Sequence, residues 1–118
     1  MELVCFQGTD KQNWPQVNAL IKKGDWEKIF LLKDSSTESF STPENCIKIN
    51  INSKAPLLEL KENIIESLKP ALSKDFEVAL SIASSTGKES MALISALLNI
   101  PVGIRLVAFT KKGIEFIS

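Results

Sequence analysis

The 118-residue chain contains neither histidine nor tyrosine, and it has a single arginine, Arg105. The lack of histidine excludes Ser-His triads, imidazole general bases and most catalytic zinc sites. Any chemistry must come from hydroxyl groups, lysine, arginine, carboxylates, thiols or backbone amides. We therefore expect no metal, and no sequence motif points to a cofactor.

The chain also lacks a net charge, because 14 basic residues balance 14 acidic ones. Proteins that bind duplex nucleic acid usually carry a clear basic excess, so duplex nucleic acid is not an expected partner. No apolar stretch approaches the ~20 residues needed to span a bilayer, and the first residues lack the pattern of a signal peptide. We expect no membrane association.

Cysteine is scarce, and the two thiols, Cys5 and Cys46, each lie in a strand-like apolar stretch. Isolated thiols in apolar runs are typical of reduced core residues in intracellular proteins. We expect both cysteines in the core and a cytoplasmic location. A disulfide between this distant pair remains the alternative.

Short apolar runs alternate with amphipathic segments along the chain. Strands are expected at residues 3–6, 28–32, 46–51, 78–83, 103–110 and 114–118, and helices at about 14–23, 56–68 and 89–98. Residues 33–45 are rich in Ser and Thr and predict a loop, and residues 111–113 predict a hairpin turn. This order favours one α/β domain, residues 1–118: a small Rossmann-like three-layer fold with a mainly parallel sheet and a C-terminal antiparallel edge hairpin.

The spacing of apolar residues predicts which helix faces are buried. In the second helix the predicted stripe is Leu57, Leu60, Ile64 and Leu68, widened by Leu58 and Ile65. In the third helix the predicted inward residues are Met91, Ile94, Leu97 and Leu98. Trp14 and Trp26 flank the first helix, where packing is a more common role for tryptophan than base stacking. Arg105 is expected to pair with a carboxylate, to enter a dimer interface or to contact a ligand.

Two strand ends carry turns of small polar residues. The candidate ligand-binding residues are Gly8, Thr9 and Asp10 after the first strand, and Ser84, Ser85, Thr86, Gly87 and Lys88 after the fourth. Ligands of open α/β sheets bind at the carboxyl ends of strands, and the start of a helix attracts anions. The alternative is a purely structural turn, with Ser84 or Ser85 capping the third helix and Asp10 or Asn13 capping the first.

Two common phosphate-binding motifs are excluded at the second turn. A Walker A loop would place a glycine at Ile82 and a hydroxyl residue at Glu89, and both positions fail. The three glycines of the dinucleotide fingerprint are absent from both turns.

The segment "VALSIASSTGKESMALISALL", residues 78–98, resembles the signature of CARF domains, the CRISPR-associated Rossmann-like modules. The family pattern is an apolar strand, small Ser, Thr or Gly residues, and a basic residue that opens an apolar helix. Ser84 and Lys88 match its hydroxyl and basic positions, whereas Ile82 departs from the Asp or Asn often found there. Gly8 and Thr9, in "CFQGTD", correspond to the family's first ligand-contacting turn.

This resemblance implies binding of a cyclic oligoadenylate second messenger across a homodimer. Some family members, the ring nucleases, cleave that ligand without a metal, and on this basis Ser84 and Lys88 are the candidate catalytic residues. The alternative function is a non-catalytic Rossmann-like interaction module, in which the Ser/Gly turn is only structural.

Overall fold

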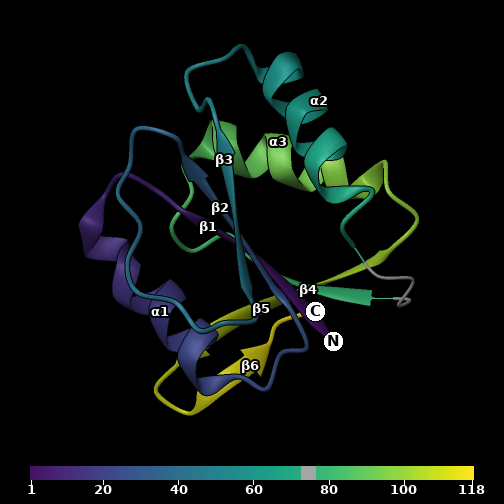
Figure 1. Cartoon of the computed structure of the whole chain (residues 1–118). Helices are drawn as coiled ribbons and strands as arrows, with labels where there is room; N and C mark the ends of the chain where they lie inside the picture. Colours follow the sequence, from purple (N-terminus) through teal and green to yellow (C-terminus); the bar gives the residue numbers. More distant parts are fainter. Residues whose placement is uncertain (73–76) are drawn as a thin grey trace.

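The computed structural model describes residues 1–72 and 77–118 and contains a six-stranded sheet with the order β3-β2-β1-β4-β5-β6. The strands are β1 (Glu2–Gln7), β2 (Ile29–Asp34), β3 (Cys46–Ile51), β4 (Glu77–Ser81), β5 (Gly103–Thr110) and β6 (Gly113–Phe116). Every neighbouring pair is parallel except β5 and β6, which form an antiparallel hairpin at one edge (Figure 1). The predicted α/β class and edge hairpin are confirmed.

Three α-helices in the described part of the chain cover the sheet. Helices α2 (Leu57–Leu68) and α3 (Gly87–Leu98) pack together on one face, and α1 (Trp14–Lys23) lies on the other, after a short 3-10 turn, η1 (Lys11–Asn13) (Figure 1). This is the three-layer arrangement of a small Rossmann-like domain. Within residues 1–72 and 77–118, no helix has the length and hydrophobicity needed to traverse a bilayer.

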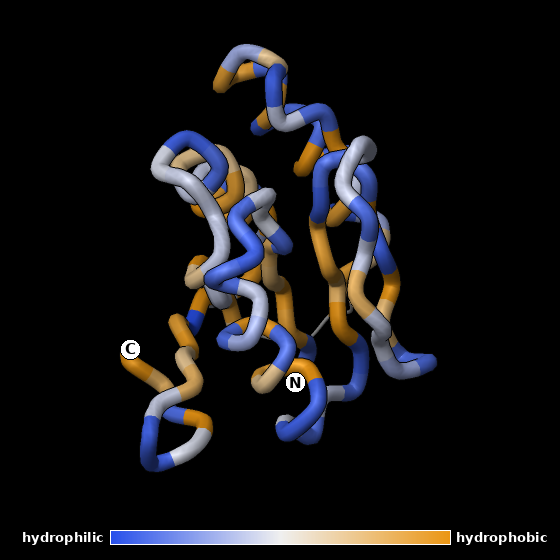
Figure 2. Tube along the Cα trace, turned by 90° about the vertical axis from the view of Figure 1, so that its left-hand side faces the viewer, coloured by the Kyte–Doolittle hydropathy of each residue, from blue (hydrophilic) through white to orange (hydrophobic). Residues whose placement is uncertain are grey.

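The central strands are apolar on both faces because helices cover both. Val4 and Phe30 point towards α2 and α3, whereas Leu3 and Leu31, one residue away along the same strands, point towards α1. All four side chains are fully buried. Continuous apolar runs of this kind are typical of parallel strands between helical layers, and the hydropathy colouring shows them through the middle of the molecule (Figure 2).

The prediction for the inward face of α3 is wrong at two positions. Met91 is 58% exposed and Leu98 is 72% exposed. The residues of α3 that do face the core are Ala92, Leu93, Ala96 and Leu97. The two alanines share a face with Leu93 and Leu97 at helical spacing, and their small side chains let α3 approach its neighbours closely. Met91 and Leu98 lie on the opposite side of the helix from that face.

The prediction that Leu58 widens the buried stripe of α2 is also wrong, because this side chain is 72% exposed. Leu60, Ile64 and Leu68 form the buried stripe as predicted. Leu58 precedes Leu60 by two residues, which is about 200° of rotation around an α-helix, so both side chains cannot face the core.

Two further expectations need correction. Both cysteines are free and Cys5 is fully buried, but Cys46, on the edge strand β3, is only half-buried. Of the alternatives for Arg105, pairing with a side-chain carboxylate is not found among the described residues: its guanidinium lies 4.4 Å from the Phe116 ring centre, and its Nε donates to the Ser118 main-chain oxygen at 3.1 Å. Aromatic and backbone partners on the terminal hairpin therefore hold Arg105.

Candidate functional site

The two polar turns meet at the carboxyl edge of the sheet. Strands β1 and β4 are parallel neighbours, with Cys5 aligned with Ser81, so the turns that follow them lie side by side. The Gly8 N–H donates to the Ser84 hydroxyl oxygen at 3.0 Å. The chain runs outwards from β1 to β3 and resumes with β4 on the other side of β1. The Gly8–Ser84 contact therefore lies where the strand order reverses, the usual ligand position in open α/β sheets.

Gly8 is held so close to the second turn that no side chain fits there. A Cβ atom on this residue would lie 2.0 Å from the Ser84 carbonyl oxygen. Ser84 itself is only 4% exposed, and its hydroxyl oxygen is occupied by the Gly8 N–H. In this conformation the buried Ser84 side chain links the turn after β4 to the turn after β1. Only the sequence supports a catalytic role for Ser84, and that role stays a prediction.

Helix α3 begins with a capping box centred on Thr86. The Glu89 N–H donates to the Thr86 hydroxyl at 3.2 Å, and the Thr86 N–H donates to the Glu89 carboxylate at 2.8 Å. The predicted cap at Ser84 or Ser85 is therefore wrong. Ser85 instead donates to the Ile82 carbonyl at 2.9 Å and shares a hydrogen bond with Ser90. Thr86 has the advantage that Glu89 stands three residues later, as a capping box requires.

The first turn of α3 retains some anion-binding character. Gly87 is exposed, with open space around its α-carbon, and the Gly87 and Lys88 amides lie where helix geometry supplies no intrahelical acceptor. The buried Glu89 carboxylate opposes this character, because it places a negative charge at the positive helix end. The capping bond gives the Glu89 carboxylate a structural role, at the position where a Walker loop has its magnesium-binding hydroxyl residue.

Lys88 reaches across to the loop after β3. Its Nζ donates to the Ser53 carbonyl at 3.0 Å, a contact between residues 35 positions apart. Among the described residues the only ion pair joins the N-terminus to Glu27, so no carboxylate neutralises the Lys88 ammonium group by direct contact. One protein oxygen therefore holds Lys88, which has three N–H donors.

Asp34, at the end of β2, anchors the loop that Lys88 contacts. One carboxylate oxygen accepts the Ser36 N–H at 2.9 Å and the Ser36 hydroxyl, and the other accepts the Ser53 N–H at 2.9 Å and the Ser53 hydroxyl. These hydrogen bonds, that of the Ser36 hydroxyl above all, hold the pKa of Asp34 well below its usual range. Asp34 thus remains ionised and ties together the loops that follow β2 and β3.

Thr9 lines a hollow of about 290 Å³ between the turn after β1 and the loop of residues 35–45. The other lining residues are Lys11, Trp14, Thr37, Glu38 and Ser39. The Trp14 indole N–H donates to the Gly8 carbonyl at 2.7 Å, and the Lys11 ammonium lies 5.6 Å from the Trp14 ring centre. Hydroxyl groups, an aromatic ring and charges of both signs therefore surround this hollow.

A second hollow, of about 560 Å³, opens beside the start of α1 and includes Ala83 from the turn after β4. Gln16 fixes one wall, because its amide oxygen accepts the Phe109 N–H at 2.8 Å. Asp10 is exposed and caps η1, the 3-10 turn before α1, by accepting the Gln12 N–H at 3.0 Å, whereas the capping alternative placed it at the start of the first helix itself. Asn13 precedes α1 without a side-chain capping bond.

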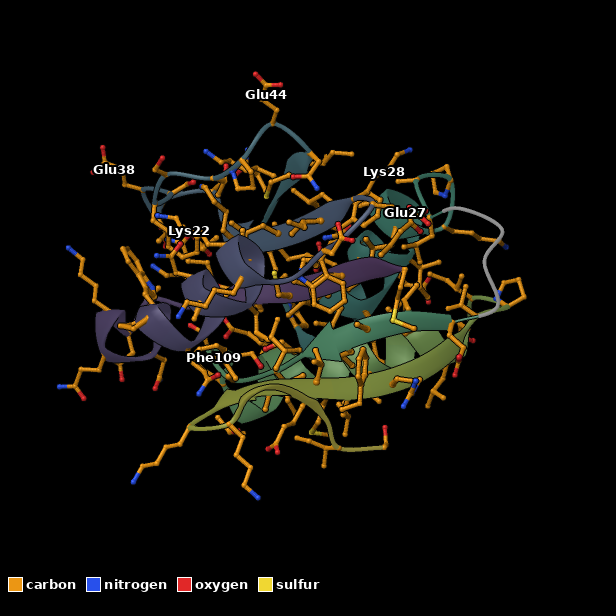
Figure 3. The ribbon with its side chains drawn as sticks, turned by 90° about the horizontal axis from the view of Figure 1, so that it is seen from below. Lys22, Glu27, Lys28, Glu38, Glu44 and Phe109 are labelled. Atoms are coloured by element: carbon orange, nitrogen blue, oxygen red, sulfur yellow. The ribbon has the colours of Figure 1, made fainter. Side chains whose placement is uncertain are left out.

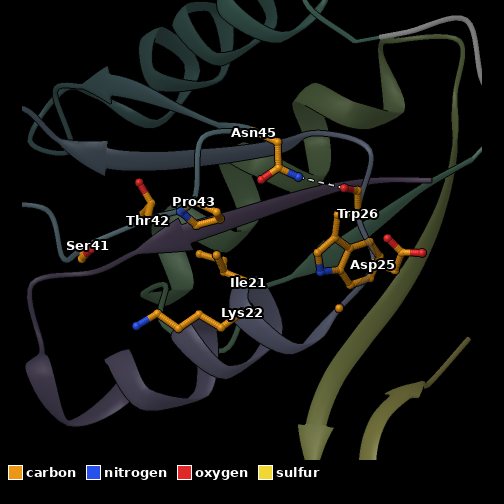
Figure 4. A pocket seen from close by; sticks show the side chains of 9 residues that line it. Ile21, Lys22, Asp25, Trp26, Ser41, Thr42, Pro43 and Asn45 are labelled. Carbon is orange, nitrogen blue, oxygen red and sulfur yellow. Dashed lines mark hydrogen bonds between the residues drawn. The ribbon is translucent and has the colours of Figure 1, made fainter.

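A third hollow, of about 440 Å³, lies between the end of α1 and the last residues of the loop before β3. Figure 4 shows Ile21 and Trp26 on one side of it and Asn45 on the other, where the Asn45 amide donates to the Trp26 carbonyl at 2.8 Å. None of the sequence-predicted site residues lines it.

The structure brings together Gly8 and Ser84, and places Lys88 against the loop after β3. The sequence pattern did not single out Asp34, Ser53 or Lys11 as parts of this region. Among residues 1–72 and 77–118, no group of three or more Cys, Asp or Glu side chains is placed to hold a metal ion. No family model, curated protein or solved structure matches the chain.

Proposed function

We propose that this protein binds a cyclic oligoadenylate at the carboxyl edge of its sheet, across a homodimer. The observation that carries the proposal is the junction of the turns after β1 and β4 at the point where the strand order reverses. The two turns are the segments that resemble those of CARF domains, and each contributes polar groups to this edge.

The chemistry of this edge suits a nucleotide with several phosphates. The amides of Gly87 and Lys88 are donors for a phosphate oxygen, and the Lys88 ammonium supplies charge-assisted hydrogen bonds. In the hollow beside Thr9, the ring of Trp14 offers a face for a base, and Thr37 offers a hydroxyl group to its edge.

Lys88→Ala is predicted to weaken binding of cyclic tetra- or hexa-adenylate about tenfold, the usual order of a lost charge-assisted contact. Isothermal titration calorimetry measures the dissociation constant of the cyclic oligoadenylate directly. Lys28→Ala is the matched control, because Lys28 is exposed and precedes β2, at the edge of the sheet opposite to the one that carries the site. Figure 3 shows its side chain at the surface. The absence of both binding heat and a thermal shift with either ring in the unaltered protein would refute the proposal.

The same site supports slow, metal-independent cleavage as an extension of this proposal. The 2′-hydroxyl oxygen of the ligand attacks the adjacent phosphorus and releases its proton to water, the bond from phosphorus to the 5′-oxygen breaks, and the 5′-oxygen takes a proton from water as a cyclic 2′,3′-phosphate forms. Lys88 and the turn amides stabilise the phosphate charge, and no histidine is needed. Lys88→Ala is expected to abolish product formation in a chromatographic assay without unfolding the protein.

The exposed apolar side chains of α3 support a homodimer. Met91 and Leu98 lie seven residues apart and therefore on one side of the helix. We predict that Leu98→Glu raises the dimer dissociation constant about tenfold, because an interface would bury the introduced charge. Leu58→Glu on α2 is the matched control, since the two leucines are equally exposed. Sedimentation equilibrium measures both, and a monomeric unaltered protein, or equal effects, would contradict the prediction.

A second candidate is an interaction module whose Ser/Gly turn is structural. The observation that favours it is that Ser84, Ser85 and Thr86 all bond to protein groups. The two functions differ in their response to ligand: a structural turn gives no amide chemical-shift change at residues 84–88 on addition of cyclic oligoadenylate.

A further inference from the structure

We propose that Asp34 is a positioning residue, which through Ser53 fixes the place of the Lys88 ammonium group at the candidate site. The ligand-binding arm of this inference rests on the proposed function, whereas its structural arm does not. The observation behind it is a continuous set of hydrogen bonds from the Asp34 carboxylate to Ser53 and from the Ser53 carbonyl to Lys88.

The first link is firm because Asp34 holds Ser53 by two atoms. The Ser53 N–H and hydroxyl both donate to the same carboxylate oxygen, so the residue can neither translate nor rotate freely. The other carboxylate oxygen is held by Ser36 in the same way. Asp34 is itself buried at the end of β2, where its backbone is aligned with Ile51 of β3, so the sheet fixes the point from which the carboxylate extends.

The second link transmits this order to Lys88. A lysine side chain has four rotatable bonds and loses much conformational entropy when it is held. The Lys88 Nζ donates to the Ser53 carbonyl at 3.0 Å, and this hydrogen bond holds the end of the side chain. If the loop of residues 52–55 shifts, the ammonium group loses this acceptor and moves away from the start of α3.

The neighbouring Lys33 does not form an ion pair with the Asp34 carboxylate. Its buried ammonium group donates to the Asp34 backbone carbonyl at 3.1 Å, rather than to the Asp34 carboxylate. The carboxylate is thus held by neutral N–H and hydroxyl donors. Its replacement by an amide removes the anionic acceptor without leaving a former ion-pair partner behind.

The structural arm of the test needs no ligand. In protein labelled with ¹³C at the lysine ε-carbons, the Lys88 signal is assigned by its loss in Lys88→Arg. Asp34→Asn is expected to move this signal towards the position of exposed lysines. Ser53→Ala, which removes one of the two Ser53 bonds and leaves the backbone in place, is expected to move it less. Glu44→Gln is the control, because Glu44 projects outward from the loop before β3 (Figure 3).

The binding arm is a double-mutant cycle with cyclic tetra- or hexa-adenylate. Asp34→Asn is expected to weaken binding about fivefold in the unaltered background and less than about twofold in the Lys88→Ala background, because Asp34 acts through Lys88. An unmoved Lys88 signal in both Asp34→Asn and Ser53→Ala, or an equal loss of affinity in the two backgrounds, overturns the inference. If neither ring binds the unaltered protein, the proposed function fails, and the NMR arm alone decides the role of Asp34.

Discussion

Gly8→Ala is expected to destabilise the protein by about 3 kcal/mol, in the upper part of the range for overpacked sites. The added Cβ would lie 2.0 Å from the Ser84 carbonyl oxygen, a contact that real structures do not tolerate. Neither the Gly8 backbone nor the Ser84 backbone can easily move to relieve this contact. Gly8 follows β1 directly, Ser84 lies three residues after β4, and the two strands are paired in the sheet. Relief of the clash therefore requires the two turns to separate, which also disrupts the candidate site.

Gly87→Ala provides the matched control. A Cβ at Gly87 meets no atom within 4 Å, and the residue is helical, at the start of α3. Alanine restricts the unfolded chain more than glycine does, so this variant is expected to gain about 0.5 kcal/mol. Urea unfolding followed by tryptophan fluorescence measures both variants, and Trp14, bonded to the Gly8 carbonyl, reports on the affected turn.

Ser84→Ala distinguishes the cause of the Gly8→Ala effect. It removes the hydroxyl group but leaves the Ser84 carbonyl in place, and the carbonyl is the closer atom to the added Cβ. The double variant is therefore expected to be no more stable than Gly8→Ala. Recovery of stability in the double variant, or a loss below about 1 kcal/mol in Gly8→Ala, would contradict a backbone clash.

The strand and helix order was predictable because apolar periodicity records burial directly. The sequence also indicated the two polar turns after the first and fourth strands. Their meeting at Gly8 and Ser84 depends on the strand order, which places β4 beside β1 and which no local pattern records. The capping residue was predictable in principle: Ser84, Ser85 and Thr86 are all good caps, but only Thr86 has a glutamate three residues later.

The links from Asp34 to Lys88 could not be predicted in the same way. Their charges place Lys33 and Asp34 in the predicted loop, although they are the last residues of buried β2. The contact from Ser53 to Lys88 joins residues far apart in the chain, and it depends on how β3 and α3 are placed. No local spacing records that placement. The faces of α3 were misjudged for a related reason, because alanine carries little hydrophobic signal despite lying at the centre of the contact.

Asp34→Ala is expected to cost about 2 to 3 kcal/mol of stability at neutral pH, the usual scale for hydrogen bonds to a charged group. Its removal leaves the N–H and hydroxyl groups of Ser36 and Ser53 without their acceptor. The expected cost is smaller than that of four full hydrogen bonds, because Ser36 and the neighbouring Asn52 are exposed, and solvent weakens charge interactions there.

The cost of losing Asp34 is also expected to depend on pH. Its pKa is lowered in the folded state by the Ser36 and Ser53 hydrogen bonds, so the unfolded chain binds a proton at this residue more readily than the folded one. The stabilisation is therefore complete above the unfolded pKa of about 4 and is lost as pH falls towards the lower folded value. Urea unfolding of the unaltered protein and Asp34→Asn at about pH 7, 5 and 3 should give a constant difference at the two higher values and a smaller one at the lowest. Asp25→Asn, a substitution of the same chemistry at an exposed aspartate, is the matched control. If the difference in unfolding free energy stays constant down to the lowest pH, Asp34 acts through its shape and not through its charge. That result would contradict a role of the ionised carboxylate in holding the loop that contains Ser53.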